Sequence, residues 1–288
     1  MAEADANIEP AVALDADAVS TPRISRRRWR GLRGLILPVL LLAIWESLSR
    51  FGVVPVNLLP APSLVLWTLW NLAAAGHLAV HIGITLERVA LGFLAGAAAA
   101  TLLGALTGYS ARWREVLDPT LQSLRAIPSI AWVPLFVLWL GIFEASKIAL
   151  IALGAFFPVY LELMSGIEHV DRKLVEVGRM YGMSGATLVR RVLLPATLPY
   201  YLVGLRGGLG LGWMFVIAAE LMGASSGLGY LLVEGQETSR PAVIIASILL
   251  FAIFGKLTDL ALERLGRRFL GWQDSFRAAQ ERQADAPR

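Results

Sequence analysis

Six long apolar runs constrain how this chain of 288 residues can fold. Each approaches the roughly 20 residues that a helix needs to cross a bilayer, and a helix satisfies its own backbone hydrogen bonds in lipid. The runs cover residues 34–51, 89–109, 121–140, 147–163, 200–221 and 241–262. The sequence therefore predicts an all-α fold, a polytopic membrane bundle of six transmembrane helices.

Composition agrees with a membrane protein and excludes several kinds of site. The chain is 56% hydrophobic and 17% charged, whereas a soluble domain has about 25% charged residues. The absence of cysteine excludes disulfides, thiol nucleophiles and cysteine metal sites. His77 and His81 are spaced i, i+4, but Glu87 is only a distant candidate for a third ligand. We therefore expect solvated histidines at the membrane interface and no metal site.

The distribution of basic residues predicts the topology. Most of the 26 lysines and arginines lie before the first run, between the second and third, between the fourth and fifth, and after the sixth. Because cytoplasmic segments carry the excess of basic residues, both termini are expected on the cytoplasmic side of the cell inner membrane. The sequence pI of about 9.7 does not indicate a nucleic-acid partner, because these residues flank apolar runs instead of lining one polar face.

The chain divides into a membrane domain and its flanking segments. Residues 1–22 are rich in Ala, Asp and Glu without apolar periodicity, which predicts a disordered cytoplasmic tail. Residues 23–33 form a basic juxtamembrane segment before an uncleaved first helix. Residues 34–265 then form the transmembrane domain, and residues 266–288 a cytoplasmic C-terminal tail.

The segment after the first span is only moderately apolar. Residues 52–87 contain several prolines and tryptophans suited to a headgroup region, and they predict an interfacial helix capped by Ser63. Glu46 and Arg50, near the end of the first span, are spaced i, i+4 and predict a surface ion pair.

Glycines and prolines are placed regularly within the spans. Small residues four apart let membrane helices approach closely, and the alternative is that they leave room along a path for a substrate. Prolines within spans predict broken helices that border cavities or moving parts. The glycines are Gly92, Gly96, Gly104, Gly108, Gly204, Gly208 and Gly212, and the prolines are Pro128, Pro134 and Pro158.

A few charged residues fall inside the spans. Arg125 lies near the start of the third span, where it either faces a cavity or partner or extends to the cytoplasmic headgroups. Arg206 lies similarly in the fifth span, and Glu220 near its outer end is expected at the interface. Lys256 and Asp259, at i, i+3 in the sixth span, are expected to pair.

The segment His169–Pro199 is a polar, basic segment between two apolar runs, and it lies on the predicted cytoplasmic face. Its first half predicts a short helix that begins at Asp171 and ends at Gly182, and its second half a helix capped by Ser184 that ends at Pro195 and Pro199. The apolar face of the first helix comprises Val170, Leu174, Val177 and Tyr181, and that of the second Leu188, Val189 and Val192. Two amphipathic helices on the membrane surface are the expected result.

Phosphate-binding motifs are missing from the sequence. The Gly-Leu-Gly of residues 227–229 lacks the preceding strand of a dinucleotide site, and we instead expect a short outer helix after Ser225 and Ser226. The one Gly-Lys pair, Gly255 and Lys256, lies within a transmembrane span. The chain is therefore not expected to bind ATP through a phosphate-binding loop.

The segment His169–Pro199 also resembles the Glu-Ala-Ala loop of ABC importer permeases. That motif reads E-A-A, three residues, G, nine residues and I-x-L-P. It is matched in spacing by Glu176, Gly182, Val192, Leu194 and Pro195. The departures are Val177 and Gly178 for the two alanines and Val192 for isoleucine, which are all small or apolar.

The resemblance extends from about Arg30 to Trp272. Over this range the sequence is similar to the nitrate, sulfonate and taurine branch of these permeases. Residues 127–142, 157–167, 176–185 and 218–232 look most like aliphatic sulfonate permeases. Permeases for taurine, nitrate or bicarbonate, and a thiamine pyrimidine precursor share much of this pattern. The resemblance implies the type I, MetI-like permease fold, a permease domain at 34–265 and a coupling loop at 169–199.

The same resemblance implies partners and roles. It implies a homodimer in membrane lipid, two ABC ATPase subunits that bind ATP and Mg, and an extracytoplasmic substrate-binding protein. It implies no cofactor and no catalytic residue in this chain, which would be a transport subunit and not an enzyme. The residues implied to dock the ATPase are Arg179, Met180, Tyr181, Gly182, Met183 and Ser184, with Glu176 fixing the loop and Pro195 returning the chain to the membrane.

The substrate path and the function class leave alternatives open. Arg125 and Arg206 could favour an anion along the path, although selectivity in such importers can reside in the binding protein. An ion-coupled transporter or channel would call for intramembrane carboxylates or an internal repeat, and a membrane-embedded enzyme for clustered His, Asp, Glu or Ser. The sequence has only scattered residues of these types.

Overall fold

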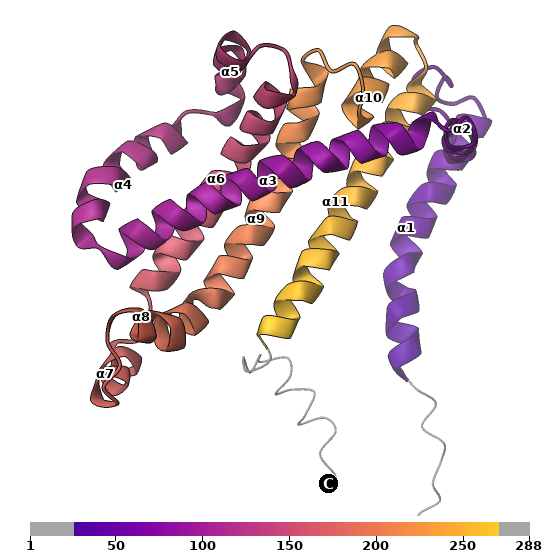
Figure 1. The fold of residues 1–288 in the computed structure, drawn as a ribbon. Coiled ribbons are helices and arrows are strands. Elements are labelled where there is room, and N and C mark those ends of the chain that lie inside the picture. Colours follow the sequence, from indigo (N-terminus) through magenta and orange to yellow (C-terminus); the bar gives the residue numbers. More distant parts are fainter. Residues whose placement is uncertain (1–25, 271–288) are drawn as a thin grey trace, which may run out of the picture.

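The computed structural model describes the backbone of residues 26–270 and the side chains of residues 36–185 and 187–270. Every regular element in that part of the chain is helical (Figure 1). The elements are α1 (Arg26–Arg50), α2 (Pro62–Ala74), α3 (His77–Tyr109), α4 (Ala111–Ala126), η1 (Ser129–Trp132), α5 (Val133–Leu140), α6 (Glu144–Glu168), α7 (Arg172–Met180), α8 (Gly185–Leu188), η2 (Val189–Leu193), α9 (Leu194–Leu221), α10 (Leu228–Glu237) and α11 (Pro241–Phe269). The predicted all-α class is confirmed. The predicted tail 1–22 and the stretch 271–288 lie outside the described residues.

Within residues 26–270, four helices are long and apolar enough to cross a membrane: α3, α6, the continuous helix Val189–Leu221, and α11. A fifth is added if α4 and the following segment of η1 and α5 count as one span. These two parts are bent by 93° relative to each other. α1 is a helix of 25 residues at the predicted position of the first span. The bundle is therefore polytopic, while the count of six spans stays a prediction.

Close glycine contacts hold α3, α6 and α9 together at the centre of the bundle. A Cβ added at Gly96 would overlap the carbonyl oxygen of Ala152, and one at Gly92 would lie 2.6 Å from the Cβ of Ile151. On the other side of α6, a Cβ at Gly208 would lie 2.8 Å from the carbonyl oxygen of Ala155. Only glycine lets these backbones meet at such distances, so the packing interpretation holds at these three positions.

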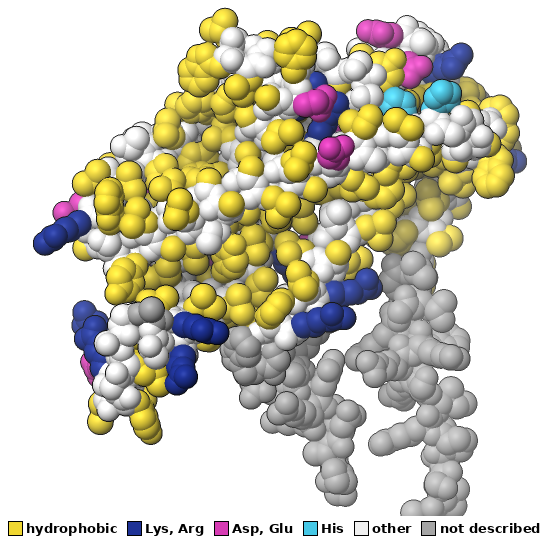
Figure 2. All heavy atoms as spheres, in the orientation of Figure 1, with side chains coloured by type: hydrophobic (Ala, Val, Ile, Leu, Met, Phe, Trp, Pro, Cys, Tyr) yellow, Lys and Arg dark blue, Asp and Glu magenta, His cyan; other side chains and the backbone are white. Residues whose placement is uncertain are grey.

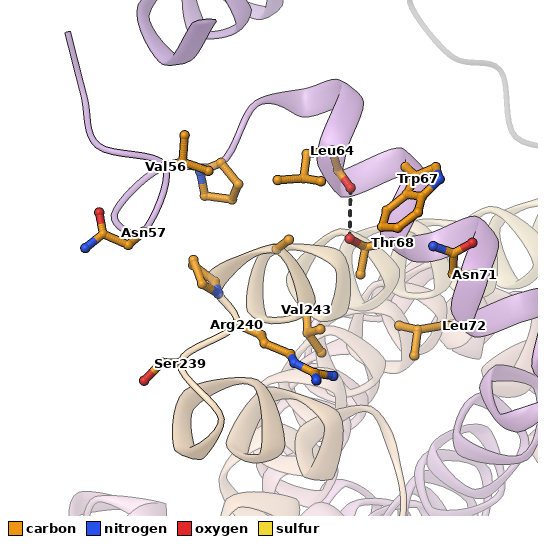
Figure 3. A pocket seen from close by; sticks show the side chains of 13 residues that line it. Val56, Asn57, Leu64, Trp67, Thr68, Asn71, Leu72, Ser239, Arg240 and Val243 are labelled. Carbon is orange, nitrogen blue, oxygen red and sulfur yellow. Dashed lines mark hydrogen bonds between the residues drawn. The ribbon is translucent and has the colours of Figure 1, made fainter. Parts of the chain in front are cut away.

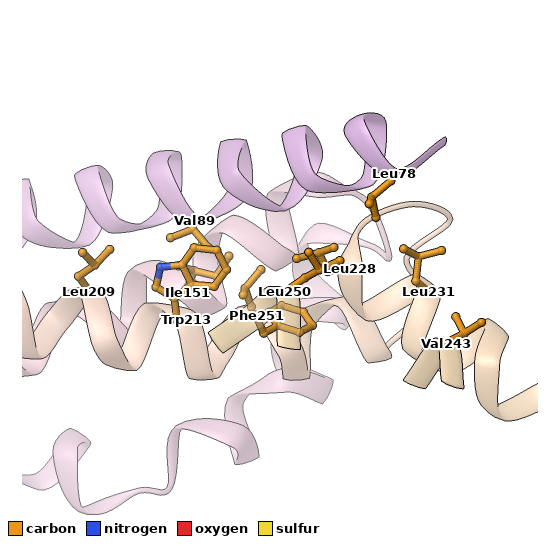
Figure 4. Packing of buried hydrophobic residues seen from close by; sticks show 11 residues of the cluster. Leu78, Val89, Ile151, Leu209, Trp213, Leu228, Leu231, Val243, Leu250 and Phe251 are labelled. Carbon is orange, nitrogen blue, oxygen red and sulfur yellow. The ribbon is translucent and has the colours of Figure 1, made fainter. Parts of the chain in front are cut away.

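Apolar packing around Trp213 extends this centre to α10 and α11 (Figure 4). Trp213 meets Phe251 edge-to-face with ring centroids 6.2 Å apart, and its Nε1–H donates to Thr258 Oγ1 at 2.8 Å. Leu228 of α10 and Ile151 of α6 are fully buried in the same cluster. The short outer helix α10 is therefore part of the folded core, and it confirms the helix expected after Ser225 and Ser226.

A pocket of about 550 Å³ lies where α2 and the preceding segment meet the start of α11 (Figure 3). Arg240 is its one charged lining side chain, and Trp67, Leu72 and Val243 contribute apolar walls. The face drawn in Figure 2 is broadly hydrophobic, with basic side chains over the α7–α8 end and acidic, histidine and further basic side chains over the opposite end.

The interruption predicted from prolines is found in the third span but not in the fourth. The third span begins earlier than predicted, at Ala111, and breaks before Pro128, where Ile127 takes the extended conformation that a following proline favours. Pro134 lies in the first turn of α5, where no backbone N–H is needed. Pro158, in contrast, lies inside an unbroken α6, so the predicted break in the fourth span is wrong.

The segment before the second span also differs from the prediction. α3 begins at His77, so the second span is longer than residues 89–109. α2 is the expected short helix, but Ser63 does not cap it, because the N-cap is Ala61. The backbone N–H and the hydroxyl of Ser63 instead donate to Glu46 at 3.1 and 2.8 Å. The predicted pair of Glu46 and Arg50 is confirmed, at 2.5 Å.

Candidate functional site

Both ends of α7 are stabilised by local hydrogen bonds. The Asp171 carboxylate accepts a hydrogen bond from the Lys173 N–H at 2.9 Å and caps the start of the helix. At the other end Gly182 has φ +74°, and its N–H donates to the Arg179 carbonyl while the Met183 N–H donates to the Gly178 carbonyl. This reversal needs a left-handed residue, which glycine supplies without steric cost. The predicted helix between Asp171 and Gly182 is confirmed.

The side of α7 that packs on the protein is not its most apolar side. Gly178 is buried, and a Cβ there would lie 2.7 Å from Leu188 and 3.1 Å from Val192. The predicted apolar face is instead largely exposed: Val170 is half-buried, but Leu174 and Val177 are exposed, as are Tyr181 at 78% and its neighbour Met180 at 86%. We call the exposed residues Leu174, Val177, Met180 and Tyr181 the α7 patch. α7 itself projects beyond the end of the bundle (Figure 1).

The second half of the loop runs directly into the membrane. α8 continues through the π-helix η2 into α9, so the predicted stop at Pro195 and Pro199 is wrong. Pro195 lies in the first turn of α9, and a wide π-turn before it accommodates a residue that has no N–H to donate. The loop and the span α9 therefore form one mechanical unit.

The remaining predicted loop residues lie close to this turn. Glu176, Arg179 and Ser184 are exposed and Met183 is half-buried. Glu176, which was expected to fix the loop, forms no ion pair or side-chain hydrogen bond within the part of the chain that the structure describes. Thr187 N–H donates to the backbone carbonyl of Ser184 at 3.2 Å, which places Ser184 at the start of α8.

The two arginines predicted to face a path have different surroundings. Arg206 donates from Nε and Nη2 to Asp259 at 2.8 and 3.0 Å and lies 3.1 Å from Glu263. Lys256 also pairs with Asp259 at 3.1 Å, as predicted. Arg125 is exposed in the last turn of α4, just before the bend. The structure does not bring these two arginines together in one pair or pocket.

A buried charge cluster at the opposite end of the bundle was missed by the sequence reasoning. Arg88 of α3 donates from Nε and Nη2 to Glu144 of α6 at 2.6 and 2.7 Å. Its Nη1 donates to Glu220 of α9 at 2.8 Å. Glu220 is 1% exposed, so its predicted place at the interface is wrong. We call Arg88, Glu144, Lys147, Glu220 and Thr85 the Arg88 cluster.

The Arg88 cluster also holds the start of α10. Glu220 accepts from the Gly229 N–H at 2.7 Å and from the Thr85 hydroxyl at 2.8 Å. Arg88 Nη1 donates to the Ser226 carbonyl at 2.6 Å, and His81 Nδ1 accepts from the Gly227 N–H at 3.0 Å. His81 is therefore a structural acceptor. No group of three or more metal-binding side chains occurs within residues 26–270.

Comparison with known proteins adds the family. Residues 92–271 match the family described as "Binding-protein-dependent transport system inner membrane component". The chain belongs to this family. It is a membrane-embedded permease subunit of a transport system and not an enzyme. A permease of this kind works with an ATPase and a substrate-binding protein, and it is a multi-pass protein of the inner membrane.

The permease has close relatives among curated proteins. It is 44% identical over 251 residues, covering 87% of this chain and 91% of the relative, to the putative aliphatic sulfonates transport permease protein SsuC of Bacillus subtilis. It is 41% identical over 241 residues, covering 83% and 91%, to the SsuC protein of Escherichia coli. The taurine transport system permease protein TauC of Escherichia coli is 34% identical over 254 residues, covering 85% and 92%. The resemblance to the nitrate, sulfonate and taurine branch is confirmed.

Sequence signals for the Arg88 cluster in this permease are faint. Its partners lie 56 and 132 residues from Arg88, on two other helices. Thr85 and Arg88 share one face of α3 at i, i+3, which is the one local hint that a polar face meets a partner there. The family match begins at Gly92, after both residues.

Proposed function

We propose that this permease imports aliphatic sulfonates that a binding protein delivers from outside the cell. Two ATPase subunits bind ATP and Mg and act on a homodimer of the chain, whose termini and α7 face the cytoplasm. The substrate assignment rests on the two SsuC relatives. Taurine, which is itself a sulfonate, is the second candidate because TauC is also a relative.

The α7 patch carries the coupling part of this proposal. Leu174, Val177, Met180 and Tyr181 are apolar yet exposed on a helix whose two ends are fixed. An exposed apolar helix face at the end of a bundle is typical of a helix that docks in a partner's groove. We assign that groove to the ATPase, and docking to the segment from Arg179 to Ser184.

Transmission from α7 to the membrane follows from its attachment. Because Gly178 has no side chain, α7 packs closely against Leu188 and Val192. The helix from Val189 to Leu221 continues from there without interruption. A displacement of α7 by a closing ATPase dimer therefore moves α9 as a lever. Through the glycine contacts α9 carries α6 with it.

A double variant tests the docking assignment. Met180→Ala with Tyr181→Ala removes the two most exposed apolar side chains of α7, and we expect co-purification of the ATPase to fall at least about tenfold, the effect of losing about 1.4 kcal/mol of binding. The matched control is Trp70→Ala, which removes an apolar side chain 73% exposed on α2 and should leave co-purification unchanged. Unchanged co-purification and uptake in the double variant would contradict the proposal.

Arg125 is the second residue with a proposed role. It is exposed beside the bend between α4 and α5, and a cation at that position would favour a sulfonate along the path. For Arg206 the same role is weakened by two nearby carboxylates, Asp259 and Glu263. Arg125→Ala should lower sulfonate uptake by reconstituted transporters, and equal uptake would remove Arg125 from the path.

A further inference from the structure

One exposed carboxylate in the Arg88 cluster neutralises two buried cations. Glu144 Oε1 accepts from Arg88 Nη2 at 2.7 Å and from Lys147 Nζ at 3.3 Å, and its Oε2 accepts from Arg88 Nε at 2.6 Å. The side chains of Arg88 and Lys147 are only 3% and 6% exposed, whereas that of Glu144 is 57% exposed. Glu144 is thus the one member of this trio that can leave without unfolding the core.

The other carboxylate of the cluster is committed elsewhere. Glu220 is fully buried, and besides Arg88 it accepts hydrogen bonds from Thr85 and from the backbone of Gly229. If Glu144 turned away, Glu220 would still neutralise one charge of the pair Arg88 and Lys147. The other charge would remain, and a buried unpaired charge is costly. An anion with one negative charge is what the vacated position then requires.

A pocket lies next to Glu144 and gives such an anion room. Its volume is about 290 Å³. The lining combines the ion pair of Arg88 and Glu144 with three aliphatic side chains, a second carboxylate and a serine: Ile84, Leu91, Ile148, Glu87 and Ser226. A charged end and an aliphatic wall in one small pocket suit a short amphiphilic anion.

We propose that Glu144 occupies an anion-binding site and that the sulfonate group of the substrate displaces it. A sulfonate oxygen in the place of Glu144 Oε1 would lie within hydrogen-bond distance of both Arg88 and Lys147. A second oxygen in the place of Oε2 would meet Arg88 Nε, in the paired geometry that guanidinium groups offer to oxyanions. The alkyl part of the substrate then lies against Ile84, Leu91 and Ile148. This inference rests on the proposed function, because it places that function's substrate.

Charge balance makes the site selective for monoanions. A sulfonate replaces the single charge of Glu144, so the local charge does not change. Sulfate would add a second negative charge beside Glu87, which lines the same pocket and is exposed. Like charges at close range repel, so sulfate should bind more weakly than an alkanesulfonate.

Glu144→Gln tests the displacement directly. The variant keeps the size and the acceptor oxygen of the side chain but removes the competing charge. In the permease purified with its ATPase subunits and without nucleotide, calorimetry with ethanesulfonate should give a Kd at least about tenfold lower than for the native complex. Lys147→Met in the Glu144→Gln background should reverse most of that gain, and sulfate should bind the Gln variant at least about tenfold more weakly than ethanesulfonate. Arg88 itself is not replaced, because Glu220 would lose its buried cation.

The matched control is Glu237→Gln. Glu237 is an exposed carboxylate at the end of α10 that does not line the pocket, so its loss should leave the Kd for ethanesulfonate unchanged. An equal Kd for the native complex and Glu144→Gln, or no measurable binding to either, would overturn the anion site. Binding-protein-dependent sulfonate uptake by the native transporter, measured in parallel, tests the proposed function separately. Sulfonate uptake with an unchanged Kd refutes only the site, and a tightened Kd without sulfonate uptake by the native transporter refutes only the substrate.

Discussion

Gly96 sets how closely α3 and α6 can approach. Its missing Cβ makes room for the carbonyl oxygen of Ala152, a backbone atom that cannot move without shifting α6. We therefore expect Gly96→Ala to destabilise the permease by about 1–3 kcal/mol through overpacking. The measurement is the temperature at which heating in detergent removes half of the monodisperse permease peak.

The same helix supplies the control. Gly83 also lies in α3, but no atom outside its own helix turn lies within 4 Å of an added Cβ. Gly83→Ala should leave the midpoint unchanged or raise it, because alanine favours a helix over glycine by up to about 1 kcal/mol. Equal losses in the two variants would show that contact with α6 is not the reason for the glycine.

Residue patterns in the sequence predicted close glycine contacts and ion pairs within one helix better than ion pairs between distant helices. The spacing of Gly92 and Gly96 identifies a surface for close approach whatever the neighbour is. Glu220 carries no such local information, because its surroundings depend on α3 and α10 meeting at that point. A lone carboxylate near a span end is therefore placed at the interface by default, and only the packed structure shows that it is buried.

At the scale of elements, the end of α7 offers a sharp test. Gly182 has φ +74° and no neighbouring atom within 4 Å, so its conformation and not its size is what the turn requires. Gly182→Val forces a β-branched residue into the left-handed region at a cost of roughly 1–2 kcal/mol, and should reorient the end of α7. We expect the chain to remain in the membrane while sulfonate uptake per ATP hydrolysed falls several-fold.

Gly182→Asn is the corresponding control. Asparagine adopts the left-handed conformation more readily than other non-glycine residues. It should keep most of the uptake per ATP hydrolysed in reconstituted transporters. If Val and Asn behave alike, the backbone conformation at Gly182 is not what coupling depends on.

The helices themselves could largely be predicted, but several of their ends and bends could not. Three prolines show why. The chain turns by 93° about Pro128, α6 passes through Pro158 unbroken, and α9 carries Pro195 in its first turn, directly after a π-turn. Proline removes one N–H in every case, and whether the helix breaks depends on the packing around it. α6 is held on both sides by glycine contacts with α3 and α9, which the sequence of α6 alone does not reveal.

At the scale of the whole molecule, α9 is joined to its neighbours by two ionic contacts of different character. Arg88 and Glu220 join α3 to α9 with side chains that are 3% and 0% exposed. Arg206 and Asp259 join α9 to α11 with side chains that are 41% and 28% exposed. The buried Arg88 cluster fixes α3 and α10 to α9, whereas the pair of Arg206 and Asp259 is partly exposed. We therefore expect α11 to shift relative to α9 more easily than α10 does.

Two alanine variants compare these two contacts. Glu220→Ala removes a buried partner of Arg88 and leaves the Gly229 N–H without its acceptor, so we expect a loss of about 3–5 kcal/mol and a strongly lowered unfolding midpoint in detergent. Asp259→Ala breaks a partly exposed pair while Arg206 keeps Glu263 at 3.1 Å, so the expected loss is about 1 kcal/mol or less.

Both changes remove one carboxylate from α9 or α11, and each is compared with the native permease at the same ionic strength. Raising the salt concentration should narrow the small difference for Asp259→Ala and leave the large one for Glu220→Ala, because buried pairs are screened less. Equal midpoints for the two variants would mean that the Arg88 cluster does not anchor the bundle.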